Sequence, residues 1–158
     1  MRNEDKTLDK VLRFTKQSYQ NFIFTKPIKF SEAIDKDEWS LKPNLKQQVK
    51  KKSGIYVIYK TGRPGALYVG STSDLSNRIQ WLFFQDKSGG FRHTLTNTLI
   101  KQKVVKDIDE AQQFYFSKCS FRYIVTENRA KATMLEGIFI EALRPLYNNE
   151  IIISYPVG

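Results

Sequence analysis

A β-hairpin is predicted in the middle of the chain, and this feature constrains the possible folds more than any other. Residues 55–59 form a compact run of β-branched and aromatic side chains, and residues 66–69 form a second strand-like run. Between them, residues 61–65 read Thr-Gly-Arg-Pro-Gly, a composition typical of a turn. Two strands joined by so short a connection pair antiparallel, and Gly70 is predicted to end the second strand.

Helices and further strands are predicted on both sides of the hairpin. The helical segments are residues 4–23, a helix that follows an N-cap at Ser73, residues 94–103, and residues 128–143, which Pro145 ends. The other strands are one within residues 114–126, where 119–125 alternate, and a short closing strand at 151–155. The Ser-Gly-Gly sequence at 88–90 is expected to break the chain. Separate helices around an antiparallel sheet are typical of the α+β class.

The composition excludes several classes of protein. The chain has 158 residues, about the size of one domain. Hydrophobic residues make up 41% of it and aromatic residues 13%, which excludes simple disorder. Cys119 is the only cysteine, so an intrachain disulfide and a cysteine-rich zinc site are both excluded. His93 is the only histidine, so a histidine-based zinc site is nearly excluded as well.

The net charge of the chain is strongly positive. Lysine and arginine number 26 against 16 aspartate and glutamate residues, which gives a formal net charge of +10. We therefore expect an anionic partner, with nucleic acid first and an acidic membrane surface second. The chain has no apolar run of about 18 residues, and its first residues are polar, so neither a membrane span nor a secretory signal is predicted. A soluble, intracellular and cytoplasmic protein is expected.

Five sequence features follow one another in a recognisable order. They are Gly-Ile-Tyr at 54–56, Tyr-Val-Gly at 68–70, Arg78 on the next helix, Glu136 in the middle of the last helix, and Asn148 after Pro145. Eleven residues separate the two tripeptides. In this order and spacing the chain resembles the GIY-YIG nuclease family, from Ser53 to about residue 149. Each tripeptide alone is a weak signal, whereas the combination is specific.

The resemblance implies a fold and a division of the chain. The family fold is a small three-stranded antiparallel sheet flanked by helices, and here an N-terminal helical extension precedes it. We expect an N-terminal helix and basic arm at 1–52, a GIY-YIG-like catalytic domain at 53–149 and a C-terminal tail at 150–158. The stretch 25–52 contains Pro27 and Pro43. It is expected to be an arm or loop, with a short strand or turn near 28–34.

The resemblance assigns a metal ligand and a phosphate ligand. Glu136 would bind Mg²⁺ (or Mn²⁺), a hard cation that prefers oxygen ligands and fills its other positions with water and phosphate. The apolar neighbours of Glu136 favour this role over that of a solvated surface glutamate. Arg78 would contact the scissile phosphate, because a guanidinium offers two fixed donors and stays charged. The alternative for Arg78 is a surface arginine on an amphipathic helix.

Tyr56, Tyr68, His93 and Asn148 complete the catalytic residues that the resemblance implies. Tyr56 would be the general base or orient the attacking water, and Tyr68 would orient water or phosphate; ordinary sheet packing is the alternative for both. A free phenol has a pKa of about 10, so a basic role for Tyr56 needs a metal or nearby cations. His93 is either a competing proton acceptor or a loop or helix-start histidine near the DNA backbone. Asn148 would bind backbone or metal-shell groups and support Glu136, unless it is a simple turn residue.

Lysines gather directly before the first strand. Lys42, Lys46, Lys50, Lys51 and Lys52 supply five positive charges in eleven residues, with no acidic residue among them. Phosphate contacts of this kind give affinity without sequence information, so we expect this run to bind DNA; a solvated charge run is the alternative. Lys60 is also expected to bind DNA. It lies on the same strand face as Tyr56 by alternation, which is compatible with an assisting role, although some family members carry such a lysine one position earlier.

The sequence therefore predicts a metal-dependent endonuclease that hydrolyses double-stranded DNA. The insertions before Ser53 and between Arg78 and Glu136 suggest a stand-alone or restriction-type member, and such nucleases often act as homodimers or higher oligomers. Two alternatives stay open, a non-catalytic DNA-binding module on the same fold and an RNA-acting protein. The apolar residues 81–84 are expected to be core or a dimer contact.

Overall fold

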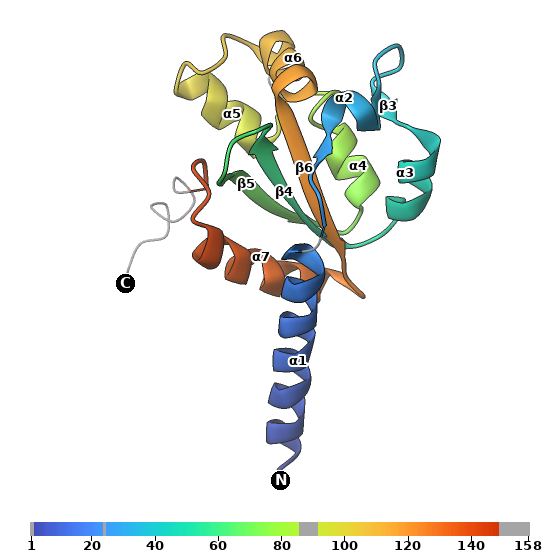
Figure 1. Ribbon diagram of the computed structural model, residues 1–158, viewed down its shortest axis with the longest axis vertical. Coiled ribbons are helices and arrows are strands. Elements are labelled where there is room, and N and C mark those ends of the chain that lie inside the picture. Colours follow the sequence, from blue (N-terminus) through green and yellow to red (C-terminus); the bar gives the residue numbers. More distant parts are fainter. Residues whose placement is uncertain (1, 24, 86–91, 149–158) are drawn as a thin grey trace.

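An antiparallel sheet lies at the centre of the computed structural model, which describes residues 2–23, 25–85 and 92–148 (Figure 1). Its strands follow the order β1-β6-β4-β5. They are β1 (Ile28–Lys29), β4 (Gly54–Lys60), β5 (Ala66–Thr72) and β6 (Cys119–Val125). The three long strands β6, β4 and β5 form the predicted three-stranded sheet, and the two-residue strand β1 adds a short fourth strand beside β6. The α+β class is thus confirmed, and β4 and β5 form the predicted hairpin.

Helices cover both faces of this sheet. They are α1 (Asn3–Ile23), α2 (Phe30–Ala33), α3 (Pro43–Val49), α4 (Leu75–Gln80), α5 (Thr94–Lys101), α6 (Ile108–Lys118) and α7 (Arg129–Leu143). Side chains alternate along a strand, so each face has its own core. On one face, Tyr56, Ile58 and Phe121 pack with residues of α2, α4, α5 and α6. On the other, Val57 packs with residues of α7 and the end of α1.

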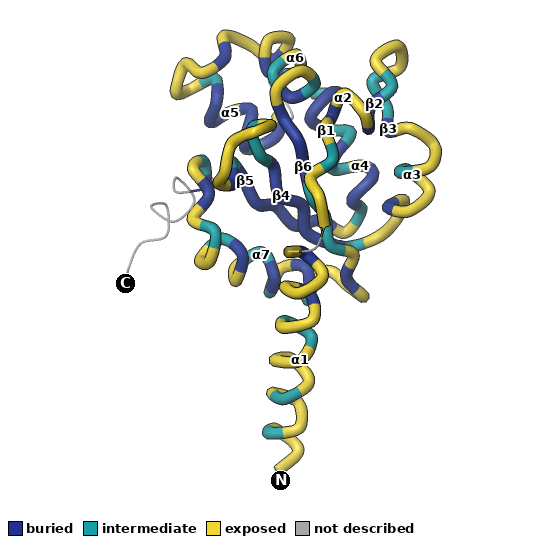
Figure 2. Tube along the Cα trace, in the orientation of Figure 1, coloured by how far each residue is buried: buried dark blue, intermediate teal, exposed yellow. Residues whose placement is uncertain are grey.

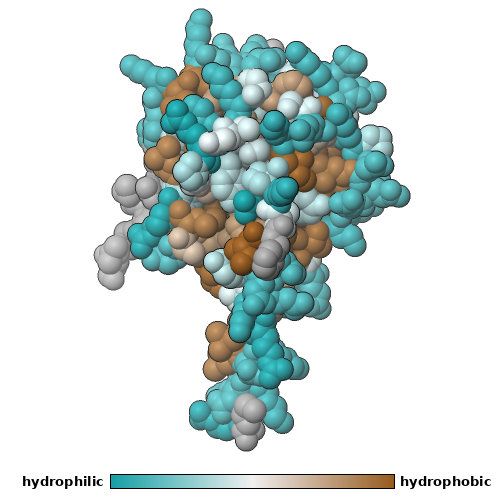
Figure 3. Space-filling model, in the orientation of Figure 1, coloured by the Kyte–Doolittle hydropathy of each residue, from teal (hydrophilic) through white to brown (hydrophobic). Residues whose placement is uncertain are grey.

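The predicted N-terminal helical extension is present as α1. Figure 1 shows its first turns projecting away from the body, and Figure 2 shows that this part is mostly exposed. Its last turn is anchored by Phe22, which is buried against Phe139 of α7. A groove between α1 and α7 is lined mostly by apolar side chains, and Figure 3 shows hydrophobic surface in this part of the molecule.

The segment before β4 is not the arm or loop that the sequence suggested. Besides β1 and α2 it contains a small two-stranded ribbon, β2 (Ile34–Asp35) with β3 (Ser40–Leu41), and the helix α3. Pro43 begins α3 instead of interrupting a loop, because its fixed φ and missing N–H suit the first turn of a helix. Phe30 is fully buried and stacks on Phe121, with 4.6 Å between ring centroids, so this segment completes the core.

Two predicted boundaries were wrong, and one helix was not predicted. Strand β5 continues through Gly70 to Thr72, because Gly70 pairs with Tyr56 in the ladder. Helix α4 is capped by Asp74, not by Ser73, and the Asp74 side chain accepts a hydrogen bond from the backbone N–H of Asn77. The strand predicted within residues 114–126 is confirmed as β6, whereas residues 114–118 end α6, a helix that was not predicted and that begins after a cap at Asp107.

The helix predicted at 128–143 is confirmed as α7, with Asn128 as its N-cap and Pro145 beyond its end. The predicted break at 88–90 and the predicted strand at 151–155 lie outside the described residues. None of the helices in the described ranges has the length and apolar composition needed to cross a bilayer.

Candidate active site

The two tripeptides meet across the β4–β5 hairpin. Tyr56 lies opposite Gly70 in the ladder, and the Tyr56 ring passes directly over this glycine. A Cβ atom at position 70 would lie 2.4 Å from the Tyr56 hydroxyl oxygen and 2.5 Å from its Cζ. Gly70 therefore opens the space that the Tyr56 hydroxyl occupies. Tyr68 is on the same strand, and its ring centroid is 6.1 Å from that of Tyr56.

Gly54 allows another close approach, at the start of β4. A Cβ atom there would lie 2.1 Å from the carbonyl oxygen of Ile124 on β6 and 2.7 Å from a methyl group of Leu75 on α4. Both terminal glycines of the motif thus serve packing. Gly54 lets β6 and α4 close on the strand, and Gly70 admits the tyrosine.

His93 reaches Tyr56 from the start of α5. It is 1% exposed, and its Nε2 lies 2.7 Å from the Tyr56 hydroxyl oxygen. Its Nδ1 accepts a hydrogen bond from the backbone N–H of Leu95 at 3.1 Å, which makes His93 the N-cap of α5. Because Nδ1 is an acceptor, the neutral ring carries its proton on Nε2 and donates it to Tyr56. Burial and, secondarily, Arg78 lower the pKa of His93 to about 3, so the ring is neutral near pH 7.

Arg78 comes to the same place from α4. Its guanidinium stacks on the ring of Trp81, which lies one helical turn further along the chain, at 5.2 Å from the ring centroid. The Nε atom of Arg78 is buried and has no hydrogen-bond partner among the described residues. Its charge lowers the pKa values of Tyr56, Tyr68 and His93, so it lies close to all three.

Glu136 approaches from α7, which packs on β4 and β5. Its side chain is half-buried. The Glu136 carboxylate raises the pKa values of both Tyr56 and Tyr68, so its charge acts on the two hydroxyls. Across the described ranges, no cluster of three or more His, Cys, Asp or Glu side chains could hold a metal ion. In the described structure, Glu136 is therefore a carboxylate outside any cluster of acidic, histidine or cysteine side chains.

Burial dominates the protonation of the two tyrosines. It raises the pKa of Tyr56 far above the ordinary value of a phenol, and the nearby Tyr68 and the charge of Glu136 raise it further. Arg78 opposes this by charge and by hydrogen bonding. Burial also raises the pKa of Tyr68, against the charge of Arg78 and hydrogen bonds from Thr94 and Tyr56. At neutral pH both hydroxyls therefore keep their protons.

The side chain of Asn148 forms its hydrogen bonds with backbone groups of β5. Its side-chain oxygen accepts from the backbone N–H of Val69 at 2.8 Å, and its amide donates to the Val69 carbonyl at 3.0 Å. Leu146 and Tyr147 donate backbone hydrogen bonds to Ala66 and Leu67. The segment 146–148 therefore pairs along the free edge of β5. Asn148 was expected to bind backbone or metal-shell groups, and in the structure it binds backbone groups.

The lysines expected to bind DNA fall into two places. Lys50, Lys51 and Lys52 are exposed between α3 and β4, and this turn is tied to α4. The backbone N–H of Lys51 donates to Asp74 at 3.1 Å, and the Lys52 carbonyl accepts from Leu75 at 2.8 Å.

Lys60 lies elsewhere, at the far end of β4 from this turn. It shares the face of Tyr56, but four residues of strand span about 13 Å. Burial raises the pKa of Cys119, and the charge of Lys60 opposes this rise. The cation that lowers the pKa of Tyr56 is Arg78 and not Lys60. The assisting role considered for Lys60 finds no support in this geometry.

Sequence reasoning missed two residues that shape the site. Gln85 accepts a hydrogen bond from the backbone N–H of His93 at 2.7 Å, and its amide donates to Leu82 and Thr96. Thr94 contacts the Tyr68 hydroxyl. An isolated glutamine and a threonine at a helix start carry no pattern that could have identified them. Of residues 81–84, Leu82 and Phe83 are buried in the core, whereas Phe84 is 54% exposed.

The comparisons with known proteins point in one direction. No family model matches this chain. A segment of 95 residues is 30% identical to the UvrABC system protein C (UvrC) of Solibacter usitatus (strain Ellin6076). This match covers 60% of the chain but only 12% of that protein, so the chain spans a small part of the length of this relative.

Two solved structures are also similar. The GIY-YIG N-terminal endonuclease domain of UvrC from Thermotoga maritima, bound to magnesium, has a TM-score of 0.42 and 22% identity, over 68% of this chain and 99% of that one. A point mutant of that domain has a TM-score of 0.41 and 20% identity, over 68% and 98% of the two chains. The chain is thus similar in sequence to part of a UvrC protein, and the solved structures that it resembles are of a GIY-YIG domain of another UvrC.

Proposed function

We propose that this chain is a metal-dependent endonuclease that hydrolyses phosphodiester bonds in double-stranded DNA. The observation that carries the proposal is that Arg78 of α4 and Glu136 of α7 both act electrostatically on Tyr56 of β4. Hydrolysis of a phosphodiester needs an oriented water, stabilised phosphate charge and a cation near the leaving oxygen. These three residues are of the types that such chemistry requires.

Arg78 is the group proposed to hold the scissile phosphate. Its buried Nε has no partner among the described residues, so it is available to a phosphate oxygen. Stacking against Trp81 fixes the plane of the guanidinium before any ligand arrives. A donor held in place in this way stabilises the charge that develops on the phosphate without being reorganised during the reaction.

Tyr56 is the group proposed to orient the attacking water. Its hydroxyl oxygen accepts a hydrogen bond from the Nε2–H of His93, and its own proton stays in place because burial raises its pKa. His93 has no free acceptor atom in this arrangement, since Leu95 occupies Nδ1 and Nε2 carries the proton. The geometry therefore makes His93 a positioning residue of Tyr56 and not a base, while a basic role for Tyr56 itself would require a cation that favours its ionised form.

Glu136 is the proposed ligand of Mg²⁺ or Mn²⁺. One protein carboxylate can hold such an ion when water and substrate phosphate fill the other coordination positions. When bound, the cation would supply positive charge that stabilises the phosphate oxygens and favours the ionised form of a nearby phenol. The solved UvrC domain is bound to magnesium, which supports this choice of metal.

The subtype proposed here is a UvrC-like catalytic module, because UvrC is the relative that the sequence matches. The stand-alone or restriction-type assignment, with its homodimer or higher oligomer, stays a prediction. The same holds for a cytoplasmic location and for the division into residues 1–52, 53–149 and 150–158. A non-catalytic DNA-binding module and an RNA-acting protein are the alternatives that the next experiment separates.

The test is a cleavage assay on plasmid and duplex DNA with Mg²⁺ or Mn²⁺. Glu136→Gln keeps the shape of the side chain but removes its charge, so we expect cleavage to be lost while DNA binding and the melting temperature stay close to wild type. Tyr56→Phe should lose nearly all activity with unchanged folding. Glu141→Gln is the matched control, since Glu141 is exposed on the same helix. Wild-type rates in both variants, or cleavage of RNA alone, would contradict the proposal.

A further inference from the structure

A second group of basic side chains lies at the turn end of the β4–β5 hairpin. Lys29, Lys60, Arg63 and Arg122 line a cavity of about 440 Å³ together with Tyr59 and Ser120, and its described lining holds no acidic side chain. Tyr59 packs with the core of the sheet face opposite Tyr56. This cavity is therefore separate from the candidate active site.

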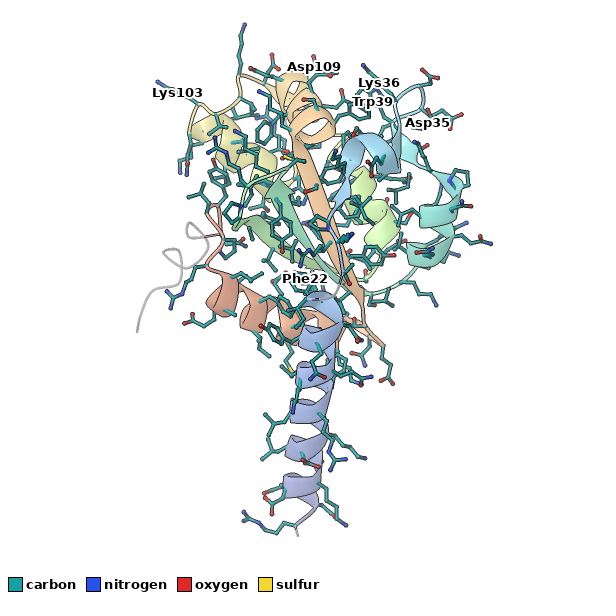
Figure 4. All side chains as sticks on the ribbon, in the orientation of Figure 1. Phe22, Asp35, Lys36, Trp39, Lys103 and Asp109 are labelled. Carbon is teal, nitrogen blue, oxygen red and sulfur yellow. The ribbon has the colours of Figure 1, made fainter. Side chains whose placement is uncertain are left out.

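Arg122 on β6 is the fixed member of this group. Its guanidinium lies between two aromatic rings, 5.0 Å from the centroid of Phe22 and 5.3 Å from that of Tyr59. Figure 4 shows Phe22 where the end of α1 meets the sheet. One terminal nitrogen of Arg122 donates to the Phe22 carbonyl at 3.4 Å, while Nε is buried without a partner in the described structure. A buried donor left unpaired costs about 1–3 kcal/mol, so this N–H retains its capacity to bind an acceptor.

The positive charge of the cavity is not compensated by neighbouring acids. Across the described residues, no ion pair includes Lys29, Lys60, Arg63 or Arg122. Lys29 and Arg63 are exposed at the rim, and Lys60 is half-buried. Four cations around one hollow attract an anion more strongly than the same charges spread over a surface.

We propose that this cavity binds a backbone phosphate of a nucleic-acid strand, outside the catalytic site. The inference rests on the proposed function, since it takes DNA to be the partner of the chain. The Nε–H of Arg122 would donate to one phosphate oxygen, and Lys29 and Arg63 would neutralise its charge at the rim. Lys60 lines the cavity from the Tyr56 face at the end of β4, four residues or about 13 Å along the strand from Tyr56, so the cavity lies at the hairpin end and not beside Tyr56.

The cavity is suited to holding a phosphate and not to cleaving it. It offers cations and a tyrosine whose pKa is raised by burial, but its described lining has no carboxylate for a metal and no histidine. Its contribution would therefore appear in the affinity for DNA and in the salt dependence of that affinity.

The test measures binding of the full chain to a labelled 25-base-pair duplex in EDTA, at several salt concentrations. Lys29→Gln with Arg63→Gln should weaken binding about five- to tenfold near 0.1 M salt, and lower the slope of log K against log salt by about 1 to 2. The control is Lys6→Gln with Lys10→Gln, which removes the same charge from exposed positions on α1 and should change affinity less than twofold. Equal weakening in the two double variants would overturn the proposal, because net charge alone would then explain it.

Arg122→Lys tests the buried donor separately. It keeps the charge but loses the Nε–H and the planar stacking, so we expect about three- to fivefold weaker binding, with the circular dichroism spectrum of the folded chain confirmed first. Arg122→Met is the second variant if lysine perturbs the fold. Folded variants of Arg122 that bind duplex DNA as tightly as wild type would overturn the proposal.

Inorganic phosphate at constant ionic strength identifies the source of the ligand. A phosphate-dependent rise in melting temperature that Lys29→Gln with Arg63→Gln abolishes, with DNA affinity unchanged, would assign the cavity to free phosphate and overturn the proposal. The outcome is independent of cleavage. A wild-type chain that binds DNA through this cavity but cuts nothing would support the inference while contradicting the proposed nuclease.

Discussion

Arg78 and Arg122 lie on different elements of the fold, and their surroundings differ in chemistry. Both guanidiniums stack on aromatic rings, Arg78 on Trp81 and Arg122 between Phe22 and Tyr59. Both leave a buried Nε without a partner in the described structure. Each arginine is therefore held in place with one donor unused, which suits the binding of an anion.

The difference is in what surrounds each guanidinium. Arg78 acts on two buried tyrosines and a neutral histidine, and the Glu136 carboxylate acts on the same tyrosines. Arg122 shares its cavity with Lys29, Lys60 and Arg63. An arginine with hydroxyls and a carboxylate can take part in bond cleavage, whereas one with further cations can only bind. Function here depends on the neighbours of the arginine and not on the arginine alone.

The largest expected effect is on the rate at Arg78. Arg78→Lys keeps the positive charge but loses the planar fork and the fixed Nε donor, so we expect the cleavage rate at saturating DNA to fall by about 10²-fold or more. Loss of the Nε–H donor at Arg122 is instead expected to raise the Kd for DNA and not to lower the cleavage rate. Single-turnover cleavage measures the rate, with Arg129→Lys on the exposed start of α7 as control. Full activity with lysine at 78 would make that residue an ordinary surface cation.

A smaller effect is expected in the stability of the fold at acidic pH. Burial lowers the pKa of His93 to about 3, and an unfolded histidine titrates near 6.5. The unfolded chain therefore binds a proton that the folded chain does not, so the free energy of unfolding should fall as pH drops from about 6.5 toward 3. We expect His93 to account for about 2 kcal/mol of this loss between pH 7 and pH 4.5.

Two substitutions separate the two hydrogen bonds of His93. His93→Asn retains an oxygen to cap α5 at Leu95, and His93→Gln retains an amide that can reach the Tyr56 hydroxyl. Both remove the imidazole, so both should flatten the acid side of the stability profile in urea unfolding. If the wild type and both variants lose stability in parallel below pH 6.5, His93 is not the group that titrates. Cleavage retained better by glutamine than by asparagine would support the positioning role.

The motif region could be predicted because its residues are constrained locally. The hairpin follows from β-branched runs and a Gly-Pro-rich turn, and α7 follows from Asn128 and Pro145 at its ends. The convergence of Tyr56, Arg78 and Glu136 was expected from the family resemblance, since no periodic pattern relates residues so far apart in sequence.

The remaining features depend on tertiary contacts that a sequence does not display. Residues 25–52 looked like an arm because of their prolines and lysines, yet Phe30 completes the core against Phe121. The role of Gln85 requires two chain segments to meet, and nothing near it in sequence signals this. The roles of Asn148 and His93 are visible only through their partners, Val69 and Leu95.

The smallest expected effect concerns the lysines before β4, which form a third basic region. Lys50, Lys51 and Lys52 are exposed, and backbone hydrogen bonds tie their turn to the start of α4, the helix of Arg78. Changing Lys46, Lys50, Lys51 and Lys52 to Gln should weaken binding to any DNA several-fold at low salt and flatten the slope of log K against log salt, because phosphate contacts release counterions. The sequence preference of cutting should stay the same, as mapping of the cleaved ends would check. An unchanged salt slope in a direct titration would mean that these lysines are only solvated surface residues. The regions around Arg78 and Arg122 would then bind DNA without them.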